Sequence, residues 1–178
     1  MNHPSDEPRI YVACLASYNA GVLHGEWIEA AQDLEMIREQ IHAMLASSPE
    51  RCAEEYAIHD YDNFGGLQIH EYENLEAIQV AAQLLQDHPE IAAPVMNYYG
   101  GLDAVEDARE AIENRYIGHF DDLGSWAQEY LNETGALDGL AEPLRCYFDF
   151  CDYGRDVELS GEIIVIEVRH QVHLLWSR

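Results

Sequence analysis

The first third of the chain alternates between apolar and polar positions in short runs that are typical of β-strands. Strand-like runs cover residues 9–16 and 21–30 on either side of the turn SYNAG, which predicts a hairpin. We expect a third strand over about residues 56–62. Between these strands, Asp33 precedes a helical repeat of apolar residues and can cap a helix. Its predicted inner face consists of Leu34, Ile37, Ile41 and Leu45.

From Glu73 onward the apolar spacing becomes helical. One face combines Leu75, Ile78, Ala82 and Leu85. Pro89 suits the first residue of a second helix, and Pro94 is expected to end or kink it. Asp103 and Glu106 have the spacing of a capping box for a third helix. The inward residues of that helix are predicted to be Val105, Ala108, Ile112 and Tyr116.

The last third repeats this mixture of helix and strand. Ser125 and Gln128 indicate a cap for a helix over SWAQEYLNETG. Pro143 can open a longer helix that continues to about residue 159. Its predicted buried residues are Leu144, Tyr147, Phe148 and Cys151. The chain is expected to close in a hairpin of residues 163–168 with 172–176. The whole pattern predicts an α+β fold of three small domains at 1–72, 73–116 and 117–178.

Charge changes this picture more than any other property of the composition. Thirty-four Asp and Glu residues face nine cations, all of them Arg, and the formal net charge of the 178 residues is -25. No Arg or Lys lies between Arg51 and Arg109, where twelve carboxylates fall. Such self-repulsion lowers stability, so it indicates solubility or attraction to a positive partner. Direct binding to nucleic acid is disfavoured.

The segment HDYDNFGGLQIHE comes close to the sequence of a calcium-binding EF-hand loop. Positions 1, 3, 6, 8 and 12 of that loop would be Asp60, Asp62, Gly65, Leu67 and Glu71. Position 5 should supply an oxygen ligand, but Phe64 stands there. In a strand, His59 points away from both aspartates unless a bulge intervenes. We therefore expect no metal site, and an acidic calcium-binding protein using residues 60–71 stays an alternative.

Signals for an enzyme are missing from the sequence. It contains no GxSxG, HExxH, P-loop or GxGxxG motif, so no motif supports an enzyme or a cofactor. The four cysteines form no CxxC pair, and we expect free, mostly buried thiols. No apolar run reaches about 18 residues and the N-terminus is polar, which favours a cytoplasmic protein without membrane contact. A halophile's acidic surface is a second alternative.

Several separate blocks resemble the ArdA family of antirestriction proteins carried by plasmids and conjugative transposons. They are RIYVACLASYNAGVLHGEWIEA, EEYAIHDYDNFGGLQIHEYENLEAI, YLNETGAL and FDFCDYGRDVELSG, in this order. The resemblance implies a non-enzymatic, elongated chain of three α+β domains, usually a homodimer. It also implies a mimic of DNA that occupies the DNA-binding groove of type I restriction-modification enzymes in the bacterial host. Incoming mobile DNA would thereby be protected.

The charge is large enough for such mimicry. B-DNA carries one negative charge per about 1.7 Å of axis, so twice -25 in a homodimer equals the formal charge of about 85 Å of duplex. Each acid taken alone is as readily a solvated charge or a helix cap. The predicted partner-binding acids, in place of phosphates, are Glu71, Glu73, Glu76, Glu106, Glu110, Glu113, Asp121, Asp122, Asp149, Asp152, Asp156 and Glu158.

Overall fold

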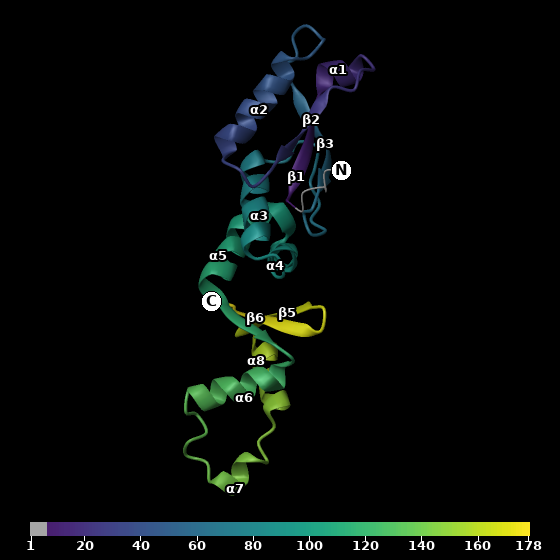
Figure 1. The fold of residues 1–178 in the computed structure, drawn as a ribbon. Coiled ribbons are helices and arrows are strands. Elements are labelled where there is room, and N and C mark those ends of the chain that lie inside the picture. The colour runs from purple at the N-terminus through teal and green to yellow at the C-terminus, as the bar shows by residue number, and fades with distance from the viewer. Residues whose placement is uncertain (1–6) are drawn as a thin grey trace, which may run out of the picture. The chain divides into compact units, whose positions relative to one another are not determined.

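The computed structural model describes residues 7–178 and confirms the α+β fold (Figure 1). Contacts group the chain into two compact units, residues 1–109 and 110–178. The finer division into three domains stays a prediction. Helix α5, Val105–Arg115, contains the boundary between the two units.

The N-terminal unit contains a three-stranded antiparallel sheet in the order β2-β1-β3. Its strands are β1 Arg9–Cys14, β2 Gly25–Glu29 and β3 Tyr56–Asp62. The predicted hairpin and third strand are therefore confirmed. Ile10, Val12 and Ile28 are fully buried in this sheet. Helix α2, Leu34–Ala46, packs against β1 and β2 and buries Ile37 and Ile41, as its apolar repeat predicts.

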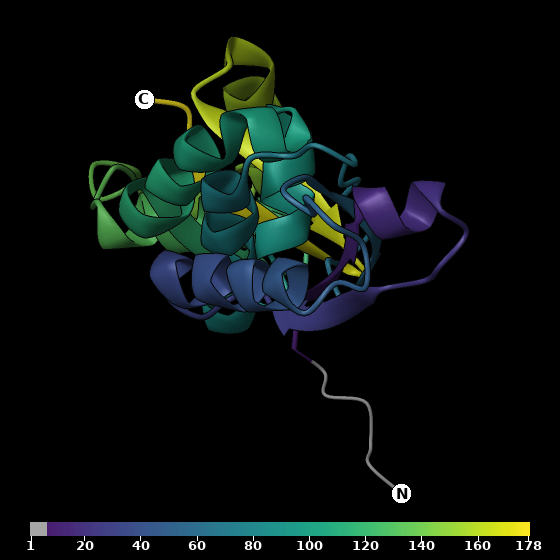
Figure 2. The same ribbon diagram turned by 90° about the horizontal axis from the view of Figure 1, so that it is seen from above.

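The end of the first predicted strand is wrong, because residues 15–19 form the short helix α1, Leu15–Asn19. Helix α1 lies near the C-terminal end of α2 (Figure 1), and Figure 2 shows the same part of the chain from above. The hydroxyl groups of Ser17 and Ser48 are 2.8 Å apart, and this bond ties α1 to the end of α2. Strand β2 consequently begins at Gly25 and not at Gly21. Asp33 occupies the N-cap position of α2 but makes no side-chain cap bond.

The remaining helices of the N-terminal unit are α3 Leu75–Asp87, α4 Ala92–Tyr99, the 3-10 turn η1 Gly101–Ala104 and the start of α5. Pro94 does not end its helix; it lies in the first turn of α4, where the missing N–H costs no intrahelical bond. Asp103 belongs to η1 and does not cap α5. Tyr116 is not inward on α5 either, because it begins the next strand and is exposed.

The C-terminal unit combines a second antiparallel sheet, in the order β4-β6-β5, with three helices. Its elements are β4 Tyr116–Phe120, α6 Leu123–Glu133, α7 Glu142–Arg145, α8 Phe150–Ser160, β5 Ile163–Val168 and β6 Gln171–Trp176. The predicted terminal hairpin is confirmed. The core of the unit combines Trp126, Ala127, Ile163 and Leu174. Helices α6 and α8 approach so closely that a Cβ on Gly154 would lie 2.7 Å from the carbonyl oxygen of Leu123.

The long helix predicted from Pro143 is wrong, because α7 and α8 are separate and residues 146–149 lie between them. Asp149 caps α8 and so starts a new helix at that point. Leu144, Tyr147 and Cys151, predicted to be buried, are exposed, and Tyr147 is 83 % exposed. The expectation of mostly buried thiols is also wrong, since three of the four cysteines are exposed and only Cys14 is buried.

Candidate functional site: an acidic surface

The predicted partner-binding acids lie on the surface of the structure. Eleven of the twelve are exposed, and Glu73 is half-buried. Two of them form ion pairs with arginines of the same helix. Glu106 pairs with Arg109, and Glu110 pairs with Arg115 at 2.7 Å. The predicted row of Glu106, Glu110 and Glu113 is thus exposed along α5, but part of its charge is neutralised.

In the N-terminal unit, three of the predicted acids gather around one hollow of about 370 Å³. We call it the acidic hollow, and it is lined by Glu73, Asn74, Glu76, Ala77 and residues 102–107. Glu73 and Glu76 come from the start of α3, which is capped by the Asn74 side chain accepting from the Glu76 backbone N–H at 2.8 Å. Glu106 comes from the start of α5. Sequence reasoning took Asp103 for a cap and missed Asp107, yet both line the same hollow.

A second hollow of about 460 Å³ shares Glu73 with the first. We call it the tyrosine hollow, and its lining residues are Leu15, Glu54, Glu55, Tyr56, Glu71, Tyr72 and Glu73. Glu71 and Glu73 were predicted, whereas Glu54, Glu55 and the two tyrosines were not singled out. The sequence signal for Glu54 and Glu55 is their place in the long stretch without cations. The sequence does not predict that Glu54 and Glu55 line the same hollow as Glu71, because this depends on the hydrogen bond from Ile58 of β3 to the carbonyl of Glu71.

In the C-terminal unit, two of the predicted aspartates accept hydrogen bonds at helix N-termini. One side-chain oxygen of Asp122 accepts from the backbone N–H of Ser125 at 2.7 Å and from its hydroxyl at 2.9 Å. These hydrogen bonds hold the pKa of Asp122 below its usual value. Asp149 accepts from the backbone N–H of Asp152 at 3.0 Å. Asp122 therefore replaces the predicted cap by Ser125 and Gln128, and both aspartates stabilise helix N-termini.

The two capping aspartates line a common hollow of about 630 Å³, although they are far apart in sequence. Its floor and walls include Tyr147, Phe148 and Phe150. The other predicted acids of this unit are exposed, but none of them lines this hollow; they are Glu110, Glu113, Asp121, Asp152, Asp156 and Glu158. The structure thus leaves these acids on the surface outside the hollow.

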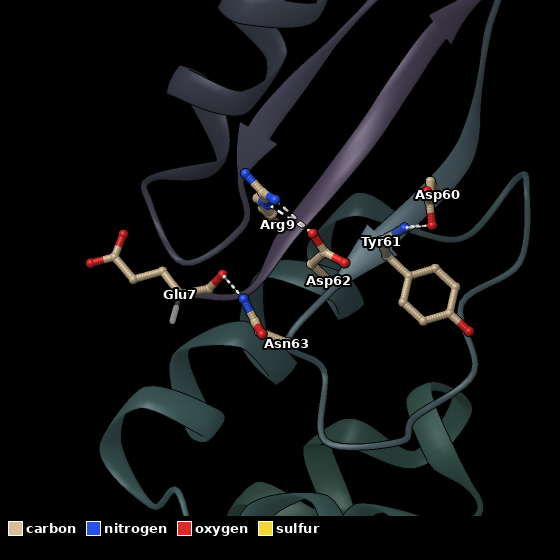
Figure 3. A network of polar contacts seen from close by, with 6 residues as sticks. All are labelled: Glu7, Arg9, Asp60, Tyr61, Asp62 and Asn63. Atoms are coloured by element: carbon tan, nitrogen blue, oxygen red, sulfur yellow. Dashed lines mark hydrogen bonds and ion pairs between the residues drawn. The ribbon is translucent and has the colours of Figure 1, made fainter. Parts of the chain in front are cut away.

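The segment that resembles a calcium loop is held by other contacts (Figure 3). Asp62 accepts from Arg9 at 2.7 and 3.1 Å, and Asp60 accepts from the backbone N–H of Tyr61 at 2.8 Å. The side chain of Asn63 donates to the carbonyl of Glu7 at 3.1 Å. Phe64, at the position of a calcium ligand, is 2 % exposed and belongs to the core.

His59 lies at an irregularity of strand β3. Tyr11 is opposite Asp60 while Val12 is opposite Ile58, so His59 is the extra residue of a bulge. Its ring packs edge-on against Tyr18, with the centroids 4.7 Å apart. The bulge therefore does not bring His59 to the aspartates. Within residues 7–178, no three His, Cys, Asp or Glu side chains are placed to hold a metal ion.

Comparisons with known proteins identify the family of the chain. Among residues 7–178, no helix has both the length and the apolar character needed to cross a membrane. A search of curated proteins finds no match. The family model described as antirestriction protein (ArdA) matches residues 10–171 of the 178-residue chain. This match includes most of both compact units and every residue that lines the acidic hollow and the tyrosine hollow. The chain therefore belongs to the ArdA family of antirestriction proteins.

Proposed function

We propose that this chain inhibits type I restriction-modification enzymes by placing its carboxylates in the groove where their DNA binds. Membership of the ArdA family implies an antirestriction function, an interaction with restriction enzymes and the role of an inhibitor in place of a catalyst. The proposal adds the class of enzyme, the groove and DNA mimicry. Inhibition in the bacterial cytoplasm would protect incoming mobile DNA from cleavage.

The observation that carries the proposal is the gathering of carboxylates around Glu73. Eight acids line the acidic hollow and the tyrosine hollow: Glu54, Glu55, Glu71, Glu73, Glu76, Asp103, Glu106 and Asp107. They come from sequence segments as far apart as Glu54 and Asp107. Only Glu106 among the eight forms an ion pair with an arginine in residues 7–178. A concentration of unneutralised charge that the fold assembles in this way is what a phosphate mimic needs.

The energetics of such binding follow from counterions. A groove that grips DNA phosphates with Arg and Lys holds anions when empty, and the carboxylates of the mimic are surrounded by cations. Association releases both sets of ions. The net charge of -25 equals that of about 42 Å of duplex for one chain, and a homodimer would double this length. Because the mimic presents no bases, binding needs no base-specific contacts.

Competition with DNA tests the proposal. A fluorescent duplex is bound to a type I methyltransferase core, and the purified chain is added at several concentrations of potassium chloride. We expect displacement of the duplex, with an apparent affinity that falls steeply as salt rises. An unrelated acidic protein of similar size and net charge is the control. If a large excess of the chain leaves the duplex bound to several such enzymes at low salt, groove occupation is wrong.

A further inference from the structure

The tyrosine hollow differs from the acidic hollow beside it because aromatic rings lie among its carboxylates. Tyr72 is 73 % exposed and stands between Glu71 and Glu73 in sequence. Tyr56 is half-buried, and Leu15 adds aliphatic surface. A phosphate mimic needs no exposed ring, since phosphates are wholly polar. Tyr72 therefore offers a partner side chain an aromatic surface among carboxylates.

The backbone around the hollow is fixed on both sides. The N–H of Leu15 donates to the carbonyl of Glu55 at 3.0 Å, which joins α1 to the start of β3. The N–H of Ile58 donates to the carbonyl of Glu71 at 2.9 Å, and the N–H of Glu73 donates to the carbonyl of His70 at 3.2 Å. Tyr72 thus lies in a turn whose two flanking residues are both tied down. Binding therefore needs to order little additional backbone. The entropy cost of binding is lower for this reason, which favours affinity.

The charge of the hollow selects the sign of its occupant. Four glutamates line it, and no arginine or histidine does. None of the four forms an ion pair within residues 7–178. A cationic group is therefore the complementary occupant.

The rings select among cations. A guanidinium is planar, is weakly hydrated and stacks on an aromatic face while donating hydrogen bonds to a carboxylate in its plane. A lysine ammonium is strongly hydrated and gains less from a ring. Arginine is also a side chain that grooves use to hold DNA phosphates. The combination of Tyr72 with Glu71 and Glu73 fits an arginine better than either a lysine or a metal ion.

We propose that the tyrosine hollow binds an arginine side chain of the inhibited restriction enzyme, with its guanidinium against Tyr72 and its N–H groups on the neighbouring glutamates. This rests on the proposed function and adds to it one contact that is not phosphate mimicry. Tyr72 becomes a specificity-determining residue. Its contribution should persist at salt concentrations that weaken the purely ionic contacts, because stacking releases no counterions.

A small-molecule probe tests the chemistry without any enzyme. The full chain is titrated with N-acetyl-arginine amide and, separately, with N-acetyl-lysine amide, and the ring signals of Tyr72 are followed by NMR. We expect the arginine amide to shift the Tyr72 signals in a saturable manner and the lysine amide to bind at least threefold more weakly. Tyr72→Ala should remove the response of the neighbouring backbone signals. Equal responses to both amides, or no saturable response, would overturn the assignment to arginine.

Affinity for the enzyme supplies the second readout. The matched control is Tyr98→Ala, which removes a 58 % exposed tyrosine of the same unit that lines neither the acidic nor the tyrosine hollow. We expect Tyr72→Ala to weaken binding about threefold to tenfold, Tyr72→Phe to retain most of the affinity, and Tyr98→Ala to change it less than twofold. The loss from Tyr72→Ala should be the same at low and moderate salt, whereas the loss from Glu71→Gln should shrink with salt.

The outcomes separate this inference from the proposed function. If the unaltered chain displaces DNA while Tyr72→Ala and Tyr98→Ala are equivalent, the arginine contact is wrong and groove occupation stands. If the arginine amide saturates the hollow but the chain displaces no DNA, groove occupation is wrong. Sedimentation velocity decides a third case. Dissociation of a dimer by Tyr72→Ala would show that a second copy of this chain covers the hollow, and would overturn the inference.

Discussion

The two compact units use their carboxylates differently. In the N-terminal unit, acids from four segments gather around Glu73, and most of them have no cationic partner. In the C-terminal unit, Asp122 and Asp149 accept hydrogen bonds from helix N-termini and line an aromatic hollow. Surface exposure is the same in both cases. Asp122 and Asp149 hold the fold because their carboxylates accept from backbone N–H groups inside the helices they cap. Among the acids around Glu73, by contrast, only Glu73 itself accepts from a backbone N–H within residues 7–178, that of Asn74 at 3.2 Å.

The largest effect is expected from the small core of the C-terminal unit. Trp126 is 1 % exposed and packs with Ala127, Ile163 and Leu174, so Trp126→Ala should lower the free energy of unfolding of this unit by about 3–5 kcal/mol. Amide hydrogen exchange would show the loss in α6 and β6. Protection of β1 in the N-terminal unit should be unchanged. An equal loss of hydrogen-exchange protection in β1 would show that Trp126 stabilises both units and not the C-terminal unit alone.

The next effect tests whether position matters as well as charge. Replacing Glu71, Glu73 and Glu76 by Gln changes the net charge by three, and so does replacing Asp121 and Asp156 by Asn together with Glu158 by Gln. We expect the first triple variant to weaken binding to a type I methyltransferase about tenfold and the second about twofold to threefold. Competition at low salt measures both. Equal losses would indicate that only the collective field of the protein matters.

The helix caps should affect stability more than binding. Asp122→Ala and Asp149→Ala each remove an acceptor from a helix N-terminus, which should lower the free energy of unfolding by about 1 kcal/mol. Asp121→Ala is the matched control, since Asp121 is exposed and lies just before the capping residue. Chemical denaturation gives the three values. A larger loss of enzyme affinity than of stability in the capping variants would assign these acids to the partner.

The smallest effect is a dependence of stability on pH. Hydrogen bonds from Ser125 lower the pKa of Asp122 in the folded chain, so its charged form is favoured by folding. The resulting stabilisation is complete above the pKa of an unfolded aspartate, about 4, and is lost as the pH falls through the lower folded value. Asp122→Asn keeps an acceptor and removes the titration. The difference in the free energy of unfolding between Asp122→Asn and the unaltered chain should therefore become smaller as the pH falls from about 4 to about 2.

Regular periodicity made much of the fold predictable. The repeat at Leu34, Ile37 and Ile41 gave one helix, and the alternation before Gly25 and after Tyr56 gave the sheet. The errors lie where tertiary contacts override local pattern. The bond between Ser17 and Ser48 joins residues thirty-one apart, and it accompanies a helix where a strand was expected.

The candidate site was predictable as composition and less so as geometry. Eleven of the twelve chosen acids are exposed. This is expected for almost any acid of a chain with a net charge of -25, because so few cations are present to pair with a buried carboxylate. The neighbours of each acid were not predictable. Glu55 and Glu71 line one hollow because the backbone N–H of Ile58 donates to the carbonyl of Glu71, and this long-range hydrogen bond has no signal in the sequence. The aromatic run at residues 147–153 suggested a buried face, whereas the break at Asp149 leaves Tyr147 in solvent.

Helix α5 has a consequence for the exchange of gene segments between relatives. The unit boundary falls between Arg109 and Glu110, inside a continuous helix. A crossover there leaves each of the ion pairs Glu106–Arg109 and Glu110–Arg115 within one parent's sequence. The backbone hydrogen bonds of the turn after Arg109, however, would each join an N–H from one parent to a carbonyl from the other. A crossover at Gly100 and Gly101, after α4 has ended, interrupts no helix. Viable chimaeras should therefore keep α5 from a single parent.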